Sequence, residues 1–219
     1  MDSWLETFAR ANFLRSADTA HDLKTPLNVA VLNLELLRMR LRKLGNGDDE
    51  KIANYAAAIE TELRRMGRIF DSFFLMATPP KDEAPQAIDV APIVADAASS
   101  FGVSVVPDGT AIVEGHEARI RQACKLFFEG ASKLLAGGTG DCSVSRDADT
   151  YTISMTGRGA TADLELSRIF KLYYTDAEGN PDLSLAVARL IAETYGGDLN
   201  AVEDRDKVSL RLSFPLGAQ

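Results

Sequence analysis

The residues best suited to chemistry lie together near the start of the chain, where residues 21–27 read His-Asp-Leu-Lys-Thr-Pro-Leu. The imidazole of His21 is a competent nucleophile near neutral pH, because its ordinary pKa is about 6.5. The carboxylate of Asp22 can accept a hydrogen bond from the other ring nitrogen and stabilise the positive charge that develops during attack. Pro26 lacks an amide donor, so it should bend a helix close to the histidine. These residues predict a nucleophilic histidine displayed on a helix.

Two apolar patterns surround this stretch and must position it. Each alternates steps of three and four residues: Leu23, Leu27, Ala30, Leu34, Leu37, Leu41 and Leu44, then Ile52, Ala56, Ile59, Leu63, Met66, Phe70 and Phe73. Such a/d seams predict one helix over about residues 4–44 and a second one that ends near Met76, joined by a glycine-containing loop. One hairpin cannot bury both seams, so we expect a homodimeric four-helix bundle. His21 lies off the seam and should face water.

The composition changes after a proline-rich, polar linker at residues 77–85. Strands are expected at residues 87–90, 103–106, 111–113, 142–145, 151–155, 198–202 and 208–214. Helices are expected at residues 91–99, 117–135, 163–172 and 183–194. The mixture predicts an α+β fold in which helices cover one face of a sheet. We therefore expect two domains, a helical hairpin over residues 1–78 and an α+β domain over residues 86–219.

Composition narrows the class of protein. The chain has 219 residues, of which 46% are hydrophobic, and a formal net charge of −8, which argues against nucleic acid or an anionic membrane as the main partner. The two cysteines, Cys124 and Cys142, form no CxxC motif, so neither a disulfide framework nor a zinc site is expected. Cys124 should be buried, and His116 should cap a helix or lie at the surface. No apolar run approaches eighteen residues and no signal peptide pattern is present, so we expect a cytoplasmic protein without membrane contact or a metal of its own.

Residues 21–27 resemble the H box of two-component sensor histidine kinases, in which the histidine carries a phosphoryl group. The histidine, acid, threonine, proline and leucine all fall at the family's spacing. The order of elements over residues 86–216 likewise resembles the catalytic ATP-binding domain that follows this hairpin in the family. The resemblance implies transfer of a phosphoryl group between His21 and the aspartate of a response-regulator receiver domain, with magnesium held by the receiver.

Several positions at which the family contacts its nucleotide carry unsuitable residues here. Leu126 and Gly130 stand in place of two asparagines, but leucine cannot donate to a phosphate and glycine has no side chain to offer a metal. Met155 replaces the aspartate that accepts a hydrogen bond from adenine. Asp182, in the stretch that replaces the second glycine-rich box, would place a negative charge against a triphosphate. These departures predict a degenerate ATP-binding domain and no cofactor on this chain.

Several functions therefore remain open. The first is a histidine phosphotransferase that relays a phosphoryl group through His21 without ATP. The second is a response-regulator phosphatase, because Asp22 and Thr25 match the acid-x-x-Thr pattern of family members that dephosphorylate their regulators; Thr25 could equally satisfy a carbonyl freed by the proline. The third is a non-catalytic pseudokinase that binds a receiver, and a divergent pocket with altered nucleotide contacts is a further possibility. The candidate contacts to the receiver are Lys24, Pro26 and Asn28.

Overall fold

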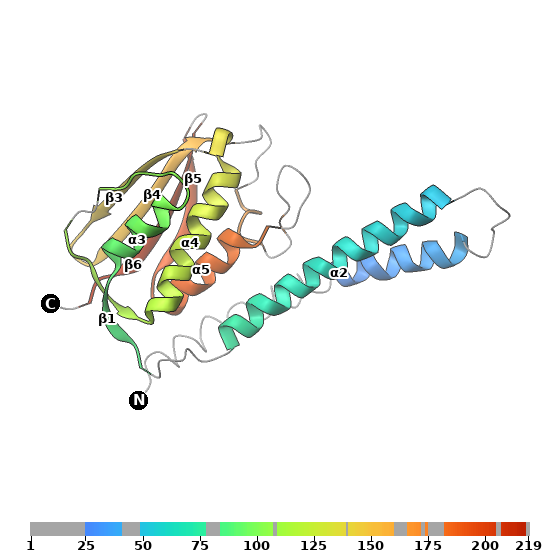
Figure 1. Cartoon of the computed structure of the whole chain (residues 1–219), viewed down its shortest axis with the longest axis horizontal. Helices are drawn as coiled ribbons and strands as arrows, with labels where there is room; N and C mark the ends of the chain where they lie inside the picture. The colour runs from blue at the N-terminus through green and yellow to red at the C-terminus, as the bar shows by residue number, and fades with distance from the viewer. Residues whose placement is uncertain are drawn as a thin grey trace. The chain divides into compact units, whose positions relative to one another are not determined.

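The computed structural model describes residues 25–40, 49–77, 84–106, 109–138, 140–159, 166–171, 174, 182–204 and 207–217 (Figure 1). Contacts divide the chain into two compact units, of which one spans Arg15–Ala77 and the other contains Thr78–Gln219. Three of the predicted site residues, His21, Asp22 and Lys24, lie outside the described residues, as does the first part of the expected long helix.

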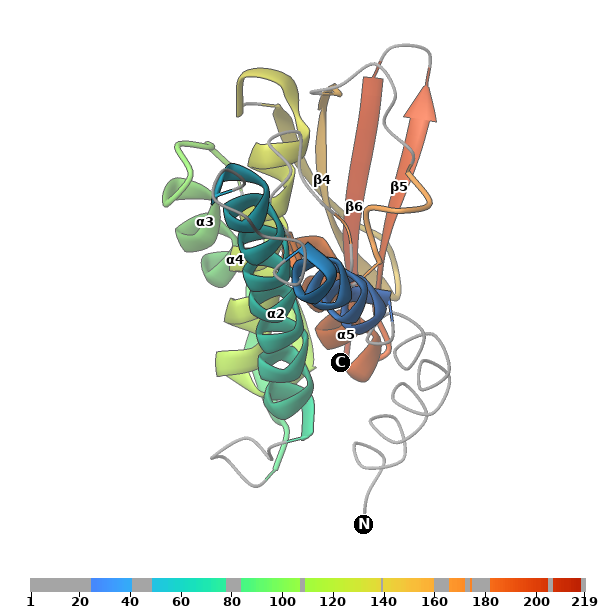
Figure 2. The same ribbon diagram turned by 90° about the vertical axis from the view of Figure 1, so that its right-hand side faces the viewer.

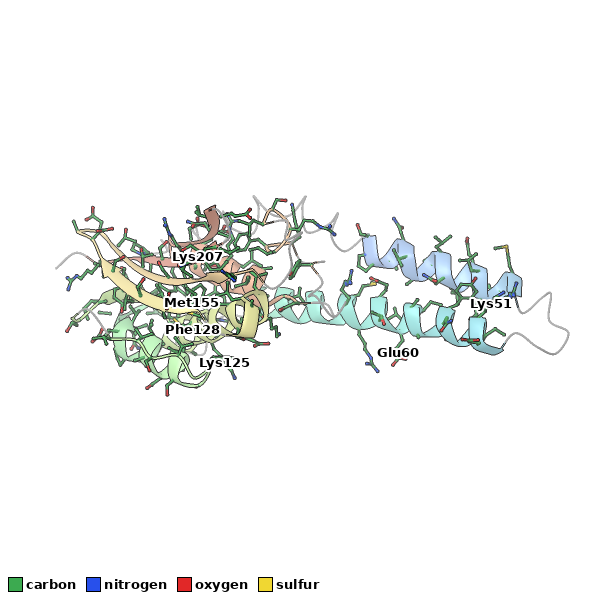
Figure 3. All side chains as sticks on the ribbon, turned by 90° about the horizontal axis from the view of Figure 1, so that it is seen from above. Lys51, Glu60, Lys125, Phe128, Met155 and Lys207 are labelled. Carbon is green, nitrogen blue, oxygen red and sulfur yellow. The ribbon has the colours of Figure 1, made fainter. Side chains whose placement is uncertain are left out.

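The first unit is a pair of helices. One covers residues 25–40, and the other, α2, spans Asp49–Ala77. The helix over residues 25–40 lies alongside the N-terminal half of α2 (Figures 1 and 3). Pro26 is the second described residue of its helix, so the expected bend before it lies outside the described residues. The structure thus contains the predicted helical hairpin.

The two apolar seams are only partly covered within this hairpin. Ala30 is buried, but 45% of Leu27 and 53% of Leu63 remain exposed, and Leu34 is exposed as well. Burial of a leucine side chain is worth about 1.5–3 kcal/mol, so seam residues left in water are unusual for a finished helical bundle. The exposed seam positions are what a hairpin presents when a second hairpin is to be packed against it.

The second unit is built on a four-stranded antiparallel sheet with the order β3-β4-β6-β5. The strands are β3 Asp141–Arg146, β4 Thr150–Arg158, β5 Asp198–Asp204 and β6 Lys207–Pro215. The helices are α3 Val90–Ser99, α4 Glu117–Leu134 and α5 Ser184–Thr194, and they lie on one face of the sheet (Figure 2). A two-stranded sheet, β1 Gln86–Asp89 with β2 Ile112–Gly115, and a short 3₁₀ turn, η1 Ala136–Gly138, complete the described elements. The predicted α+β fold class is confirmed.

The core of this unit is formed by every second residue of the strands together with the sheet-facing side of the helices. The helix-facing residues of β4 and β6 are fully buried, and between them stand serines and threonines that reach solvent. The buried ones are Tyr151, Ile153, Met155, Leu210, Leu212 and Phe214. In the register, Ile153 faces Leu212 and Met155 faces Leu210. Opposite them, Phe127 and Phe128 of α4 pack edge to face, with ring centroids 5.2 Å apart. This layer contains Met155 of β4, and Leu126 and Gly130 lie on α4, the helix that covers it.

Two expectations outside the main elements are wrong, and a third holds only in part. Residues 103–106 form no strand, because the helix α3 ends in a turn at Gly102, whose φ is +70°, and the following segment finds no partner strand. Val106 is accordingly 87% exposed. Residues 166–171 form turns instead of the middle of a helix, as the bond from the Lys171 amide to the Arg168 carbonyl shows. His116 occupies the N-cap position of α4, as expected, and its carbonyl accepts the Arg119 and Ile120 amides, but the residue is buried and its side chain makes no capping hydrogen bond.

Among the described residues, no helix is long and apolar enough to cross a membrane.

Candidate functional site

Of the stretch over residues 21–27, the described part lies at the start of the helix over residues 25–40. Thr25 is half-buried, Pro26 is buried and Asn28 is exposed. Thr25 follows His21 by four residues and Asn28 follows it by seven, a spacing that puts side chains on one face of a continuous helix. Of the candidate receiver contacts that the structure describes, Asn28 is therefore the accessible one.

Gly130 lies in the C-terminal half of α4, where it is buried against the first turn of α5. A Cβ atom added to Gly130 would lie 2.5 Å from Cγ and 2.8 Å from Cδ2 of Leu185. Carbon atoms do not approach this closely, so even an alanine requires Leu185 to move, and an asparagine requires more. Position 130 therefore lacks both a metal-binding side chain and the space for one.

Leu126 precedes Gly130 by one helical turn of α4 and is half-buried. Its side chain has no polar atom, so this position adds apolar surface and no donor. Neither of the two positions therefore offers a polar side chain on α4.

Met155 lies in the middle of β4 and is only 1% exposed. Its neighbours in the register are Cys142 on β3 and Leu210 on β6. Figure 3 shows Met155 in the interior of the unit, as it shows Phe128 of α4. A thioether is a weak acceptor at best, and a fully buried one cannot meet the edge of a base. This position is a core residue in the present structure.

Asp182 lies just before α5 and is buried, with its carboxylate turned toward the helix start. Its Oδ1 accepts a hydrogen bond of 2.9 Å from the Ser184 amide, and its Oδ2 lies 3.5 Å from Nζ of Lys133. Lys133 also donates to Oε1 of Glu129, at 2.8 Å. Partial burial lowers the pKa of Lys133, but the hydrogen bond to Glu129 and the charge of Asp182 outweigh this effect and leave the pKa raised. The carboxylate of Asp182 is thus already engaged on both oxygens.

These positions do not fit a magnesium-bound nucleotide. The residues at positions 126, 130 and 155 supply neither an oxygen ligand for the metal nor a carboxylate acceptor for adenine. Asp182 is the single oxygen-bearing side chain of the four, and it is held by Ser184 and Lys133. Among the described residues, no cluster of three or more histidine, cysteine, aspartate or glutamate side chains could hold a metal ion.

Sequence reasoning missed the partners of these residues. Glycine inside a helix is unfavourable by about 1 kcal/mol relative to alanine, so Gly130 on the buried side of an amphipathic helix was a usable signal of close packing. Nothing in the sequence indicated that its neighbour would be Leu185. The ion pair between Lys133 and Asp182 joins residues 49 positions apart and had no local signal.

Cys124, Cys142 and His116 have structural roles in this unit. Burial raises the pKa of the Cys124 thiol to about 12 and that of Cys142 to about 11, so neither is a nucleophile near neutral pH. The expectation of a buried Cys124 is confirmed. Nδ1 of His116 lies 2.9 Å from the hydroxyl of Tyr195, which ties the start of α4 to the end of α5.

Comparison with known proteins shows what this chain is similar to. Residues 14–80 match the His Kinase A (phospho-acceptor) domain. Sensor protein CzcS of Cupriavidus metallidurans is 27% identical over 225 residues, which cover 92% of this chain and 45% of CzcS. Sensor protein ChvG of Agrobacterium fabrum is also 27% identical, over 88% of this chain and 36% of its own length. The chain thus spans about half or less of the length of these relatives.

Solved structures of similar shape include a histidine kinase, AdeS of Acinetobacter baumannii. It has a TM-score of 0.48 and 14% identity, and covers 90% of this chain and 98% of its own. The ATP-binding domain of PrrB from Mycobacterium tuberculosis has a TM-score of 0.49 and 20% identity, over 61% of this chain and 98% of its own.

Proposed function

We propose that this chain, which carries a His Kinase A (phospho-acceptor) domain over residues 14–80, passes a phosphoryl group between His21 and the aspartate of a response-regulator receiver domain without taking it from ATP. The family match and the sensor-protein relatives support the sensor histidine kinase family and phosphotransfer of the two-component kind. The independence from ATP rests on this chain's own residues.

The proposed transfer is a single displacement at phosphorus. The unprotonated ring nitrogen of His21 attacks the phosphorus of the receiver's aspartyl phosphate, the N–P bond forms, and the acyl P–O bond breaks to leave a carboxylate on the receiver. Asp22 accepts a hydrogen bond from the other ring nitrogen and stabilises the imidazolium-like product. The magnesium that neutralises the transferring oxygens belongs to the receiver. The reverse step passes the group on to a second receiver.

One observation carries the ATP-independent part of the proposal, namely the close packing of Leu185 on Gly130. At 2.5 Å from the added Cβ, Leu185 occupies the space that a metal-binding side chain at position 130 would need. The buried Met155 and the engaged Asp182 support the same conclusion from the adenine and phosphate sides.

The partner of the hairpin is proposed to be a second copy of the chain. Leu27, Leu34 and Leu63 are seam residues, and all three are exposed in a single chain. A homodimeric four-helix bundle would bury them.

The test is a pair of labelling reactions on the full chain. With γ-labelled ATP and magnesium alone, we expect no label on the protein. With a receiver domain that has been phosphorylated and freed of its donor, we expect label on the chain, and His21→Ala should abolish it. Label that arrives from ATP alone and is lost in His21→Ala would show an ATP-dependent kinase and overturn the ATP-independent part.

A second candidate function is dephosphorylation of the receiver. The observation that favours it is the spacing of Asp22 and Thr25, which matches family members with this activity. In this role the Thr25 hydroxyl would orient the water that attacks the aspartyl phosphate. If neither transfer nor hydrolysis occurs but the receiver still binds, irrespective of His21, the chain is a non-catalytic receiver-binding protein.

A further inference from the structure

The start of α5 places an apolar and an acidic side chain against the C-terminal half of α4. Leu185, in the first turn of α5, packs on Gly130, and the segment just before the helix brings Asp182 to within 3.5 Å of Lys133. Both Leu185 and Asp182 are buried. The junction between the two helices is therefore filled by the chain itself.

The polar part of this junction has the groups that usually hold an external anion. A free amide at a helix N-terminus and a lysine ammonium commonly hold phosphate or carboxylate groups together. Here the Ser184 amide and the Lys133 ammonium both contact the carboxylate of Asp182, at 2.9 Å and 3.5 Å. The Asp182 amide in turn donates to the Tyr174 carbonyl at 3.0 Å, which holds the residue in place.

The charges of the junction oppose a second anion. Lys133 contributes one positive charge, while Asp182 and Glu129 contribute two negative ones, and both carboxylates lie within ion-pair distance of the Lys133 ammonium. A free phosphate must compete with a carboxylate that is tethered beside its amide donor, and tethering within one chain gives effective concentrations of millimolar or more.

We infer that the start of α5 is a built-in plug of the junction between α4 and α5, in which Leu185 fills the space over Gly130 and the Asp182 carboxylate takes the place of an external anion on Ser184 and Lys133. This inference rests on the proposed ATP-independent function and adds to it the contacts that keep the junction closed. The contact is autoinhibitory, because a carboxylate of the chain itself occupies the position where an external anion would bind.

The apolar half of the plug is tested by thermal melting of the full chain. Leu185→Ala should lower the Tm by about 5–15 °C, because it leaves a cavity. Gly130→Ala should lower the Tm of the wild type by a few degrees, because the new methyl meets Leu185. In the Leu185→Ala background, the same Gly130→Ala change should leave the Tm unchanged or raise it, because the methyl now fills part of the cavity.

The matched control is Ile88→Ala, which also removes three carbons from a buried side chain but in β1. Ile88 pairs with Val113 of β2, close to the N-terminus of α4, whereas Gly130 lies about 20 Å further along that helix. Gly130→Ala should lower the Tm of the Ile88→Ala variant as it lowers that of the wild type. An equal decrease in the Leu185→Ala background would show that Gly130 and Leu185 are not in contact and would overturn this half.

The polar half is tested by amide exchange and by inorganic pyrophosphate. Exchange of the Ser184 amide hydrogen should be about tenfold faster in Asp182→Ala than in the wild type, and unchanged in Asp182→Asn, which keeps an acceptor oxygen. Pyrophosphate at millimolar concentration should raise the Tm of Asp182→Ala but not that of the wild type. Glu129→Ala, which removes the other partner of Lys133 and leaves Asp182 seated, should respond like the wild type.

If pyrophosphate raises the Tm of the wild type and of Asp182→Ala equally, or raises neither, Asp182 is not the occupant of an anion site and this half is overturned. None of these measurements includes a phosphotransfer step. If the melting and exchange results hold but the chain is labelled by ATP, the proposed function fails and the plug stands. If the Tm changes caused by Gly130→Ala and Leu185→Ala simply add in the double variant, and ATP still gives no label, the plug fails and the proposed function stands.

Discussion

The guanidinium carbon of Arg189 lies 5.1 Å from the centroid of the Phe170 ring. The same guanidinium pairs with Glu193 at 2.9 Å within α5 and with Asp198 at 3.3 Å at the start of β5. One side chain therefore connects the turn segment over residues 166–171 to a helix and to the edge of the sheet. Cation–π contacts and charged hydrogen bonds of this kind contribute about 1–2 kcal/mol when partly shielded from water.

Arg189→Ala should therefore lower the free energy of unfolding by about 1–2 kcal/mol and speed hydrogen exchange in residues 166–171. Urea unfolding and exchange mass spectrometry measure the two effects. Arg211→Ala is the control, because Arg211 is exposed on β6, and it should change stability by less than about 0.5 kcal/mol. Unchanged exchange in the segment after removal of Arg189 would show that Phe170 is held by other contacts.

Thr25→Ala separates phosphatase from phosphotransfer chemistry. If Thr25 orients the attacking water, the variant should slow loss of receiver phosphate at least about tenfold, as is typical for a group that positions a reactant, while labelling of His21 continues. Thr61→Ala is a matched control, because Thr61 is an exposed helix threonine whose hydroxyl donates to the Ala57 carbonyl. Equal hydrolysis rates in all three proteins would assign Thr25 a structural role.

Leu27→Glu and Leu63→Glu test the proposed dimer. Each places a charge at an exposed seam position that a second hairpin would cover, and a buried unpaired charge is strongly unfavourable. The dimer dissociation constant, measured by analytical ultracentrifugation, should rise at least about 100-fold, which corresponds to roughly 2.7 kcal/mol. Asn54→Glu adds the same charge at an exposed position of α2 outside the seam and should leave the dimer intact. A wild-type chain that sediments as a monomer would refute the dimer itself.

Alkaline pH should weaken the second unit through Cys124. Its pKa is raised to about 12 by burial, above the value near 9 expected once the thiol is in water. The folded state therefore retains a proton that the unfolded state releases, so this contribution to stability is complete below about pH 9 and is lost as the pH rises toward 12. Between pH 9 and 11, the wild type should lose about 1.4 kcal/mol per pH unit more than Cys124→Ala, as measured by urea unfolding. Parallel pH profiles of the two proteins would contradict a fully buried thiol.

Local patterns in the sequence were sufficient for most of the elements. The alternation along β4 and β6, and the helical spacing of α4, each identify a buried face from side chains a few residues apart. The prediction failed at residues 103–106, where the alternation of valines suggests a strand but no neighbouring strand is available to bond it. It also failed at residues 166–171, where short turns replace a helical pattern. A strand exists only as part of a sheet, and a sheet is a property of distant segments.

For the candidate site, the sequence by itself determined which atoms are present: a histidine followed by an acid at residues 21 and 22, a glycine at 130, a methionine at 155 and an aspartate at 182. Only the tertiary structure decided what these residues contact. Leu185 closes on Gly130 across 55 positions, and Asp182 reaches Lys133 across 49. The physical reason is that chemistry belongs to single side chains, whereas packing and charge pairing depend on neighbours that the fold brings together from far apart in the chain.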